Sequence, residues 1–183
     1  MKLHAHRDSL GKIDFSSRTY WAGSPGNAVS QQCCLFSPGL NEDFVTVILA
    51  EFAPGEVRIV NCGHHPPVKL AAGGGSLQVM APDGFSPPLG LHPRPARQGI
   101  ELKPGDRLLF YTDGLVETRD RAGRFFDLDH RVAAALALPD LGTAVKRVVR
   151  LLLEHSGNGL ADDVLLVLGE PRRPRHSACV TSA

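Results

Sequence analysis

The chain has 183 residues and a formal net charge of +1, with 43% hydrophobic and 21% charged residues, so we expect one globular domain with its own core. The near-zero charge gives no electrostatic basis for binding nucleic acid or a membrane surface. No stretch approaches the roughly 18 uninterrupted apolar residues of a membrane span. The N-terminus lacks a basic-then-apolar signal segment, so we expect a cytoplasmic protein.

Residues 1–43 form a poorly defined segment, in which glycine, serine and proline are scattered without a period. A weak helix is expected near Asn27–Phe36. His4 and His6 have the spacing of a metal-binding pair, but two histidines near a terminus are far more often solvated. None of the cysteines has C-x-x-C spacing, which predicts neither a zinc ribbon nor a disulfide framework. These cysteines are Cys33, Cys34, Cys62 and Cys179.

From Phe44 onward the sequence predicts β-strands, rich in β-branched and aromatic residues and separated by glycine and proline turns. Three successive hairpins are expected, and they favour an antiparallel sheet, because parallel strands need long crossovers. The paired strands are Phe44–Phe52 with Val57–Asn61, Pro67–Ala71 with Leu77–Met80, and Gly99–Leu102 with Arg107–Thr112.

Two helices and a closing strand follow the hairpins. Asp129–Leu138 is alanine-rich and short, and Leu141–His155 carries one apolar stripe at helical spacing, which predicts core packing. Asp140 or Thr143 is expected to cap the start of the second helix, and Gly157 to end it. The apolar residues of the stripe are Val145, Val148, Val149, Leu152 and Leu153.

Val164–Leu168 is apolar on both faces, which predicts a central strand. The chain from Pro171 onward is rich in proline and arginine, and we expect residues 171–183 to be a disordered tail. Strands followed by helices and one last strand indicate an α+β fold. The expected domain is therefore residues 44–170.

Carboxylates stand at the ends of two of these strands. Asp113 ends an apolar strand and precedes Gly114, and Asp162 and Asp163 directly precede the last strand. A hard divalent cation held between two strands needs such oxygen ligands. An Asp-Gly pair after a strand is, however, most often only a turn. Because side chains alternate along a strand, Asp162 and Asp163 cannot both face one site, and the residues alone do not choose between them.

Four motifs come in order along the chain: Asn61-Cys-Gly-His-His-Pro-Pro-Val68, Pro88-Leu-Gly-Leu91, Leu102–Glu117 and Ala161–Val167. In these motifs the segment from Phe44 to Glu170 resembles the SpoIIE-like branch of the PPM-type (type 2C) metal-dependent serine/threonine phosphatases. That branch includes bacterial phosphatases that act on anti-anti-sigma proteins. The resemblance implies an antiparallel β-sandwich flanked by helices, with two Mn²⁺ or Mg²⁺ ions at one end. It also implies hydrolysis of phosphoserine or phosphothreonine by water, without a phosphoenzyme.

The resemblance assigns roles to single residues. Asp113 matches the aspartate of the family's T-D-G motif, a metal ligand, and Asp162 matches the first aspartate of the D-D motif, also a ligand. Gly114 then allows close approach of backbone beside the metal, and Asp163 belongs to the surroundings of the site. From the residues alone, a turn explains Gly114 as well as a role beside a metal does.

His64 and His65 match the family's A-G-H-x-P-P segment, which has a structural role more than a catalytic one. We expect a histidine there whose hydrogen bonds are satisfied and which holds the turn. Cys62 replaces the usual alanine, a small residue for a small one in a buried position.

The family's upstream half carries G-D-x-x-D and D-V-S-G-x-G segments, and neither occurs in residues 1–43. The chain is thus expected to hold about half of a two-metal site, to lack the N-terminal part of the fold, and to have weak or no activity as it stands. A displaced start of the coding sequence, a degenerate fragment and a non-catalytic module are three explanations. The leading hypothesis is a metal-dependent phosphatase acting on an anti-anti-sigma-type phosphoprotein. The alternative is an interaction module that binds a regulatory partner.

Overall fold

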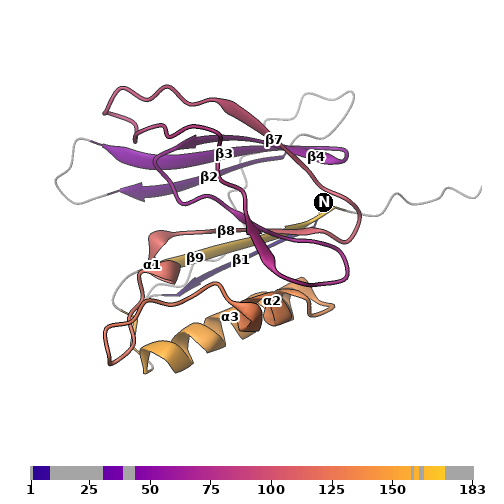
Figure 1. Ribbon diagram of the computed structural model, residues 1–183, viewed down its shortest axis with the longest axis vertical. Coiled ribbons are helices and arrows are strands. Elements are labelled where there is room, and N and C mark those ends of the chain that lie inside the picture. Colours follow the sequence, from indigo (N-terminus) through magenta and orange to yellow (C-terminus); the bar gives the residue numbers. More distant parts are fainter. Residues whose placement is uncertain (1, 9–30, 39–43, 158, 161–162, 172–183) are drawn as a thin grey trace, which may run out of the picture.

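The computed structural model describes residues 2–8, 31–38, 44–157, 159–160 and 163–171, which form two antiparallel sheets facing each other (Figure 1). One sheet has the strand order β1-β9-β8-β5-β6 and the other β2-β3-β4-β7. The first contains β1 (Lys2–Asp8), β5 (Val68–Leu70), β6 (Leu77–Val79), β8 (Arg107–Tyr111) and β9 (Val164–Glu170). The second contains β2 (Gln31–Pro38), β3 (Val45–Ala53), β4 (Glu56–Cys62) and β7 (Arg97–Glu101).

Strand β8 lies at the centre of the molecule and is buried along its whole length. Leu108 and Phe110 face the other sheet, where Phe110 meets the ring of Phe52 edge-on, whereas Leu109 and Tyr111 face the helices. Apolar side chains on both faces therefore give β8 and β9 cover on both sides, which explains their continuous hydrophobic sequence. The expected central position of the last strand is confirmed, because β9 lies between β1 and β8.

The helices cover the outer face of the five-stranded sheet (Figure 1). They are α1 (Asp113–Val116), α2 (His130–Leu136) and α3 (Leu141–Ser156). Asp140 caps α3 by accepting the N–H of Thr143 at 2.7 Å, and Gly157 ends it at φ 73°. Both expected longer helices are confirmed, as is the apolar stripe of α3, which packs against β8 and β9.

Two of the expected elements are wrong. The hairpin expected between Gly99–Leu102 and Arg107–Thr112 does not form, because β7 pairs with β4 and β8 pairs with β5 and β9. The turn between β7 and β8 crosses from one sheet to the other, since a strand apolar on both faces needs a central position. The helix expected near Asn27–Phe36 is wrong from Gln31 onward, where β2 pairs with β3 over its full length. That pairing is a long-range contact that local periodicity does not reveal.

Two of the three expected hairpins are present, and the remaining N-terminal and C-terminal expectations fall largely outside the described residues. The hairpins β3–β4 and β5–β6 are confirmed. In the N-terminal segment, residues 2–8 form β1, which pairs antiparallel with β9. His4 and His6 belong to this strand, but their side chains lie outside the described part of the structure. The tail expected from residue 171 onward also lies outside it, apart from Pro171.

The crossing turn at the start of β8 is held by a buried carboxylate. Asp106 accepts the N–H groups of Ala72 at 2.8 Å and Lys103 at 3.0 Å, and its Oδ2 lies 2.8 Å from Nζ of Lys69. Burial raises the pKa of Asp106, but the hydrogen bonds from Lys69, Lys103 and Ala72 outweigh it and bring the pKa below its usual value. The turn is thus fixed by a charged group that is fully paired.

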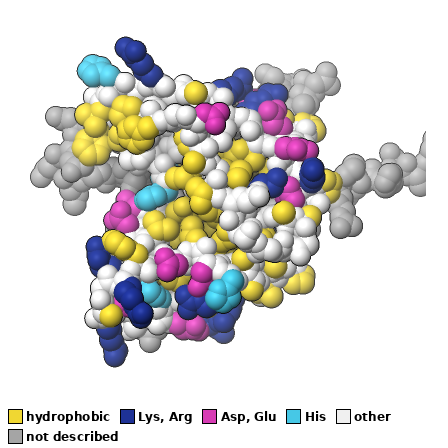
Figure 2. Space-filling model, in the orientation of Figure 1, with side chains coloured by type: hydrophobic (Ala, Val, Ile, Leu, Met, Phe, Trp, Pro, Cys, Tyr) yellow, Lys and Arg dark blue, Asp and Glu magenta, His cyan; other side chains and the backbone are white. Residues whose placement is uncertain are grey.

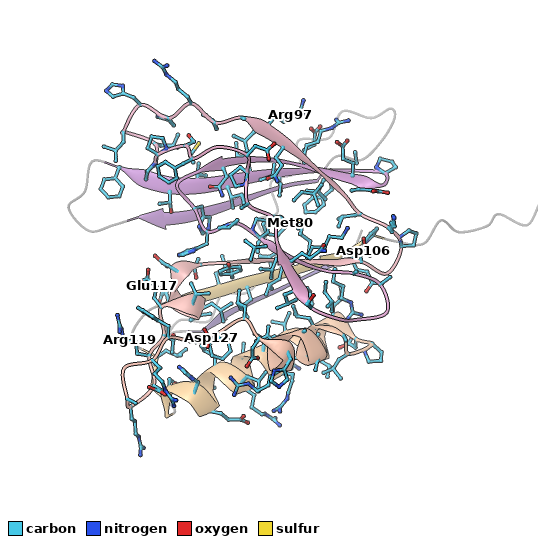
Figure 3. All side chains as sticks on the ribbon, viewed as in Figure 1. Met80, Arg97, Asp106, Glu117, Arg119 and Asp127 are labelled. Atoms are coloured by element: carbon cyan, nitrogen blue, oxygen red, sulfur yellow. The ribbon has the colours of Figure 1, made fainter. Side chains whose placement is uncertain are left out.

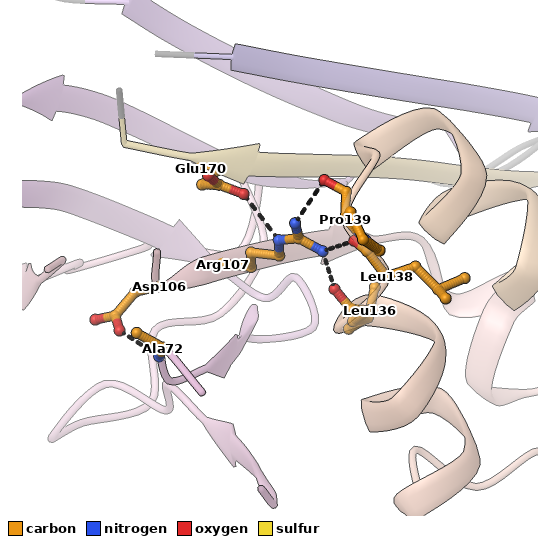
Figure 4. Close-up of polar contacts among 7 residues, drawn as sticks. All are labelled: Ala72, Asp106, Arg107, Leu136, Leu138, Pro139 and Glu170. Atoms are coloured by element: carbon orange, nitrogen blue, oxygen red, sulfur yellow. Dashed lines mark hydrogen bonds and ion pairs between the residues drawn. The ribbon is translucent and has the colours of Figure 1, made fainter. Parts of the chain in front are cut away.

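Arg107, the next residue, joins β8 to the end of α2 (Figure 4). Its guanidinium donates to the carbonyl oxygens of Leu136, Leu138 and Pro139, and its Nε lies 2.9 Å from a carboxylate oxygen of Glu170. The carbonyls at the end of a helix have no partner within the helix. Arg107 supplies that partner from the sheet, so α2 is fixed on β8.

Candidate functional site

Asp113 stands at the opposite end of β8, where the strand stops and α1 begins. Thr112 joins this end to the start of β9 by three hydrogen bonds. Its N–H donates to the carbonyl of Leu165 at 3.1 Å, its hydroxyl donates to the carbonyl of Asp163 at 3.2 Å, and its Oγ1 accepts the N–H of Leu165 at 3.0 Å. The end of β8 and the start of β9 therefore lie together. Thr112 directly precedes Asp113 in the T-D-G motif, but the motif by itself does not reveal this role of its side chain.

Gly114 brings the two backbones into close approach. A Cβ atom on Gly114 would lie 2.5 Å from the carbonyl oxygen of Asp163 and 3.3 Å from Cγ2 of Val164. No larger residue fits without moving β9. The close approach at Gly114 is to the chain's own residue 163, and its place beside a metal stays a prediction.

Only one oxygen of the Asp113 carboxylate has a hydrogen bond within the described residues. Its Oδ1 accepts the N–H of Gly114 at 2.9 Å, and within the described part of the chain Oδ2 has no hydrogen bond or ion pair. The side chain is half-buried, so it has access to a ligand. Asp162 lies outside the described residues, and a cation shared by Asp113 and Asp162 stays a prediction. Asp163 is exposed. Its backbone carbonyl oxygen accepts the hydroxyl of Thr112 and lies close to Gly114.

His64 lies beside this end of β8, in the segment that leads from β4 to β5. Its backbone N–H donates to Oδ1 of Asn61 and its carbonyl accepts from Nδ2 of Asn61, both at 2.8 Å. Its Nδ1 accepts the N–H of His65 at 2.9 Å, and the ring of His65 stacks on Tyr111 with centroids 5.9 Å apart. The expected structural role of this segment thus has a physical basis. Cys62 is buried, as expected.

The expectation that His64 is fully satisfied is wrong for one atom. The residue is 7% exposed, and its Nε2 is buried and has no hydrogen-bond partner among the described residues. Burial lowers the pKa of His64, the neighbouring His65 lowers it further, and the nearby Asp113 carboxylate partly opposes both. A neutral ring at neutral pH follows. No local sequence signal reveals this arrangement, because the expected hairpin pairs the β8 segment with Gly99–Leu102, whereas β8 pairs with β5.

The described residues do not by themselves fit a metal centre. Among them, no group of three or more histidine, cysteine, aspartate or glutamate side chains is arranged to hold an ion. Mg²⁺ requires about six ligands in octahedral geometry, with one or two carboxylates among them, and Asp113 is a single carboxylate.

None of the described helices is long and apolar enough to cross a bilayer.

Solved structures define the class of this fold. The chain aligns with the serine/threonine phosphatase PstP/Ppp from Mycobacterium tuberculosis at a TM-score of 0.53 and 19% identity, over 71% of this chain and 61% of that one. It aligns with the PP2C phosphatase domain of SpoIIE from Bacillus subtilis at a TM-score of 0.56 and 15% identity, over 72% and 40% of the two chains. The sandwich therefore has the PPM-type (type 2C) phosphatase fold.

The sequence comparison narrows the class to a family. The model of the Stage II sporulation protein E (SpoIIE) family matches residues 22–171. The chain belongs to the SpoIIE family. The RsbU and RsbW domains of Rv1364c from M. tuberculosis align at a TM-score of 0.60 and 27% identity, over 71% of this chain and 37% of that one. The chain spans less than two thirds of each of these three structures.

Proposed function

We propose that the chain belongs to a metal-dependent protein serine/threonine phosphatase, in which Asp113 and Asp162 are ligands of Mn²⁺ or Mg²⁺. The observation that carries the proposal is the junction of Thr112 with Asp163 and Leu165, together with the tight contact of Gly114 on residue 163. Asp113 directly follows Thr112 and Asp162 directly precedes Asp163 in the sequence, and the proposal requires both carboxylates at this end of the sheet. Membership of the SpoIIE family supports the assignment of phosphatase chemistry.

The residues of this chain have separate parts in that chemistry. When bound, the metal ions activate a water molecule and neutralise charge on the phosphate. Asp113 contributes one oxygen ligand, with its orientation set by the Gly114 N–H. Thr112 and Gly114 keep the ends of β8 and β9 together. Because the described residues contain no group of three or more ligand side chains that could hold an ion, we expect at most weak hydrolysis from this chain alone.

The substrate in this proposal is a small phosphorylated regulatory protein of the anti-anti-sigma type. The alignment with the RsbU and RsbW domains of Rv1364c, at 27% identity, supports a regulatory protein as the partner. We place this activity in the cytoplasm, where such signalling proteins act.

Hydrolysis of p-nitrophenyl phosphate tests the proposed activity. We expect a slow rate that requires Mn²⁺ or Mg²⁺, is removed by EDTA and is lost in Asp113→Asn. A rate that is indifferent to EDTA, or one that Asp113→Asn retains, would contradict the proposal. If the wild-type chain shows no hydrolysis, the second candidate function is favoured.

The second candidate is a non-catalytic module that binds a regulatory protein. The loop between β6 and β7 exposes three large hydrophobic side chains, Phe85, Leu89 and Leu91, with exposed fractions of 86%, 39% and 49%. Figure 2 shows hydrophobic side chains gathered at the upper left, where this loop lies in Figure 1. Apolar side chains exposed together are typical of protein contact surfaces. This candidate predicts no hydrolysis, no rise in melting temperature with Mn²⁺, and partner binding that Phe85→Ser weakens.

A further inference from the structure

Strand β7 forms one edge of the four-stranded sheet, and its backbone is open on the side away from β4 (Figure 1). Just beyond the paired residues of β4 and β7, Leu102 donates its N–H to the carbonyl of Gly55 at 2.9 Å. Backbone groups along an antiparallel strand alternate in direction, so those of Arg97, Gly99 and Glu101 point away from β4. All three residues are exposed, and for a glycine this means that the backbone itself meets solvent.

Most of these outward backbone groups have no partner in the described part of the chain. The carbonyl of Glu101 accepts Nζ of Lys69 at 2.7 Å, which agrees with its direction away from β4. The outward N–H and C=O groups of Arg97 and Gly99 make no hydrogen bond with any described residue. A row of free donors and acceptors along a strand is a template for pairing with a further strand.

The charges on this edge are complementary to a second copy of themselves. The side chains of Arg97 and Glu101 lie on the same face of β7, and their exposed fractions are 62% and 75%. When two copies of β7 pair antiparallel around a two-fold axis at Gly99, residue 97 of each copy lies opposite residue 101 of the other. An axis at residue 97 places arginine opposite arginine, and an axis at residue 101 places glutamate opposite glutamate. The charges therefore favour the register centred on Gly99.

The surroundings of Glu101 also favour an added cation. Its cross-strand neighbour on β4 is Glu56, and like charges directly opposite each other are destabilising. Its ion pair with Lys103 is 3.9 Å long and exposed at both residues. Oε2 of Glu56 lies 2.9 Å from Nε of Arg58, whereas Glu101 has no comparably short ion pair within the described residues. An arginine from a second copy would offset the repulsion between the two glutamates.

We propose that the open edge of β7 is the contact surface for a second copy of this chain, in a two-fold symmetric dimer. The two four-stranded sheets join into one, with the N–H of each Gly99 donating to the carbonyl of the other. Arg97 of each copy forms an ion pair with Glu101 of the other. Such an interface uses the same patch on both copies and closes at two chains. The dimer requires neither a metal nor hydrolysis, so it stands or falls independently of the proposed function.

Sedimentation velocity of the full chain over a wide range of concentration tests the proposal, and we expect a reversible monomer–dimer equilibrium. Arg97→Glu and Glu101→Arg each place like charges opposite each other twice per dimer, so the Kd of dimerisation should rise about 10-fold or more. An equimolar mixture of the two variants restores opposite charges at both contacts and should dimerise as the wild type does. Arg150→Glu makes the same charge change on the exposed face of α3 and is the matched control, with unchanged Kd.

Two further measurements keep the result interpretable. Melting curves of dilute protein show that the variants stay folded, since exposed ion pairs contribute little to stability. Added salt screens the two ion pairs, so the wild-type dimer should weaken as the salt concentration rises.

Three results would overturn the proposal. They are a wild-type chain that stays monomeric, an assembly that forms equally well in Arg97→Glu and Glu101→Arg or is indifferent to salt, and folded variants that do not pair when mixed.

Discussion

The two ends of β8 differ in how completely their polar groups are paired. At the start of the strand, every side-chain nitrogen and oxygen of Asp106 and Arg107 has a partner. At the other end, Nε2 of His64 and Oδ2 of Asp113 have no hydrogen-bond partner within the described part of the chain. Figure 3 shows the separation, with Asp106 at one end and Glu117, just after α1, at the other.

The difference separates residues that stabilise the fold from residues that are able to bind a ligand. A buried polar group without a partner costs about 1–3 kcal/mol, so a group that persists unpaired needs a reason. At the Asp106 end, pairing stabilises the crossing between the sheets and the attachment of α2. At the Asp113 end, incomplete pairing leaves the half-buried carboxylate of Asp113 accessible to a ligand. Substitutions at the two ends should therefore affect different properties.

The largest effect on stability is expected at Arg107. Arg107→Met keeps much of the side-chain volume but leaves the carbonyls of α2 and the Glu170 carboxylate unpaired. We expect a loss of about 3–5 kcal/mol in the free energy of unfolding, measured with urea. Arg131→Met is the control, because Arg131 makes an exposed ion pair with Asp129 and should lose less than about 1 kcal/mol. Equal losses in both variants would contradict the comparison.

The same isosteric change at the two ends gives the next effect. Asp106→Asn places an amide among the groups of Lys69, Lys103 and Ala72, so we expect a loss of about 2–3 kcal/mol. Asp113→Asn keeps an oxygen for the Gly114 N–H and should change stability by less than about 0.5 kcal/mol. Thermal unfolding of the metal-free proteins measures both. A destabilised Asp113→Asn would show that this end also supports the fold.

Gly114→Ala tests the contact that joins β8 to β9 at the site. The new methyl group would push against the carbonyl of Asp163, and we expect a loss of about 1–2 kcal/mol by thermal unfolding. Gly84→Ala is the matched control, because nothing lies within 4 Å of its Cβ position. If both variants melt alike, the close approach at Gly114 has no energetic importance.

The smallest effect is a difference in pH dependence. The pKa of His64 in the folded state lies below its unfolded value of about 6.5, so the unfolded chain binds more protons just below that pH. Stability should therefore fall as the pH drops below about 6.5, by at most about 1.4 kcal/mol per pH unit. His64→Leu should remove this slope.

Asp106 affects the free energy of unfolding in a lower pH range than His64 does. Its folded pKa lies below the unfolded value of about 3.9, so its contribution is present above that pH and is lost as the pH falls through the folded pKa. Asp106→Asn should flatten the curve below about pH 4 and leave the slope near pH 6 unchanged. Unfolding by urea at several pH values measures both variants. If both variants changed the stability over the same pH range, this would contradict the conclusion that the two ends of β8 act separately.

Much of the fold could be predicted because its signals are local. The apolar stripe and caps of α3, the turns of the first two hairpins and the run that forms β9 each depend on neighbouring residues. The crossing between β7 and β8 and the strand β2 could not be predicted in this way, since both depend on pairing with distant segments.

The sequence by itself determined the family motifs, the strand-end carboxylates and the glycine beside Asp113. Only the tertiary structure decided that Thr112 binds the start of β9, that Arg107 holds α2, and that Nε2 of His64 is buried with no partner among the described residues. Motifs are strings of residue types and can be read without coordinates. Whether a polar atom finds a partner depends on the register and packing of segments far apart in the chain, and these exist only once the sheets have formed.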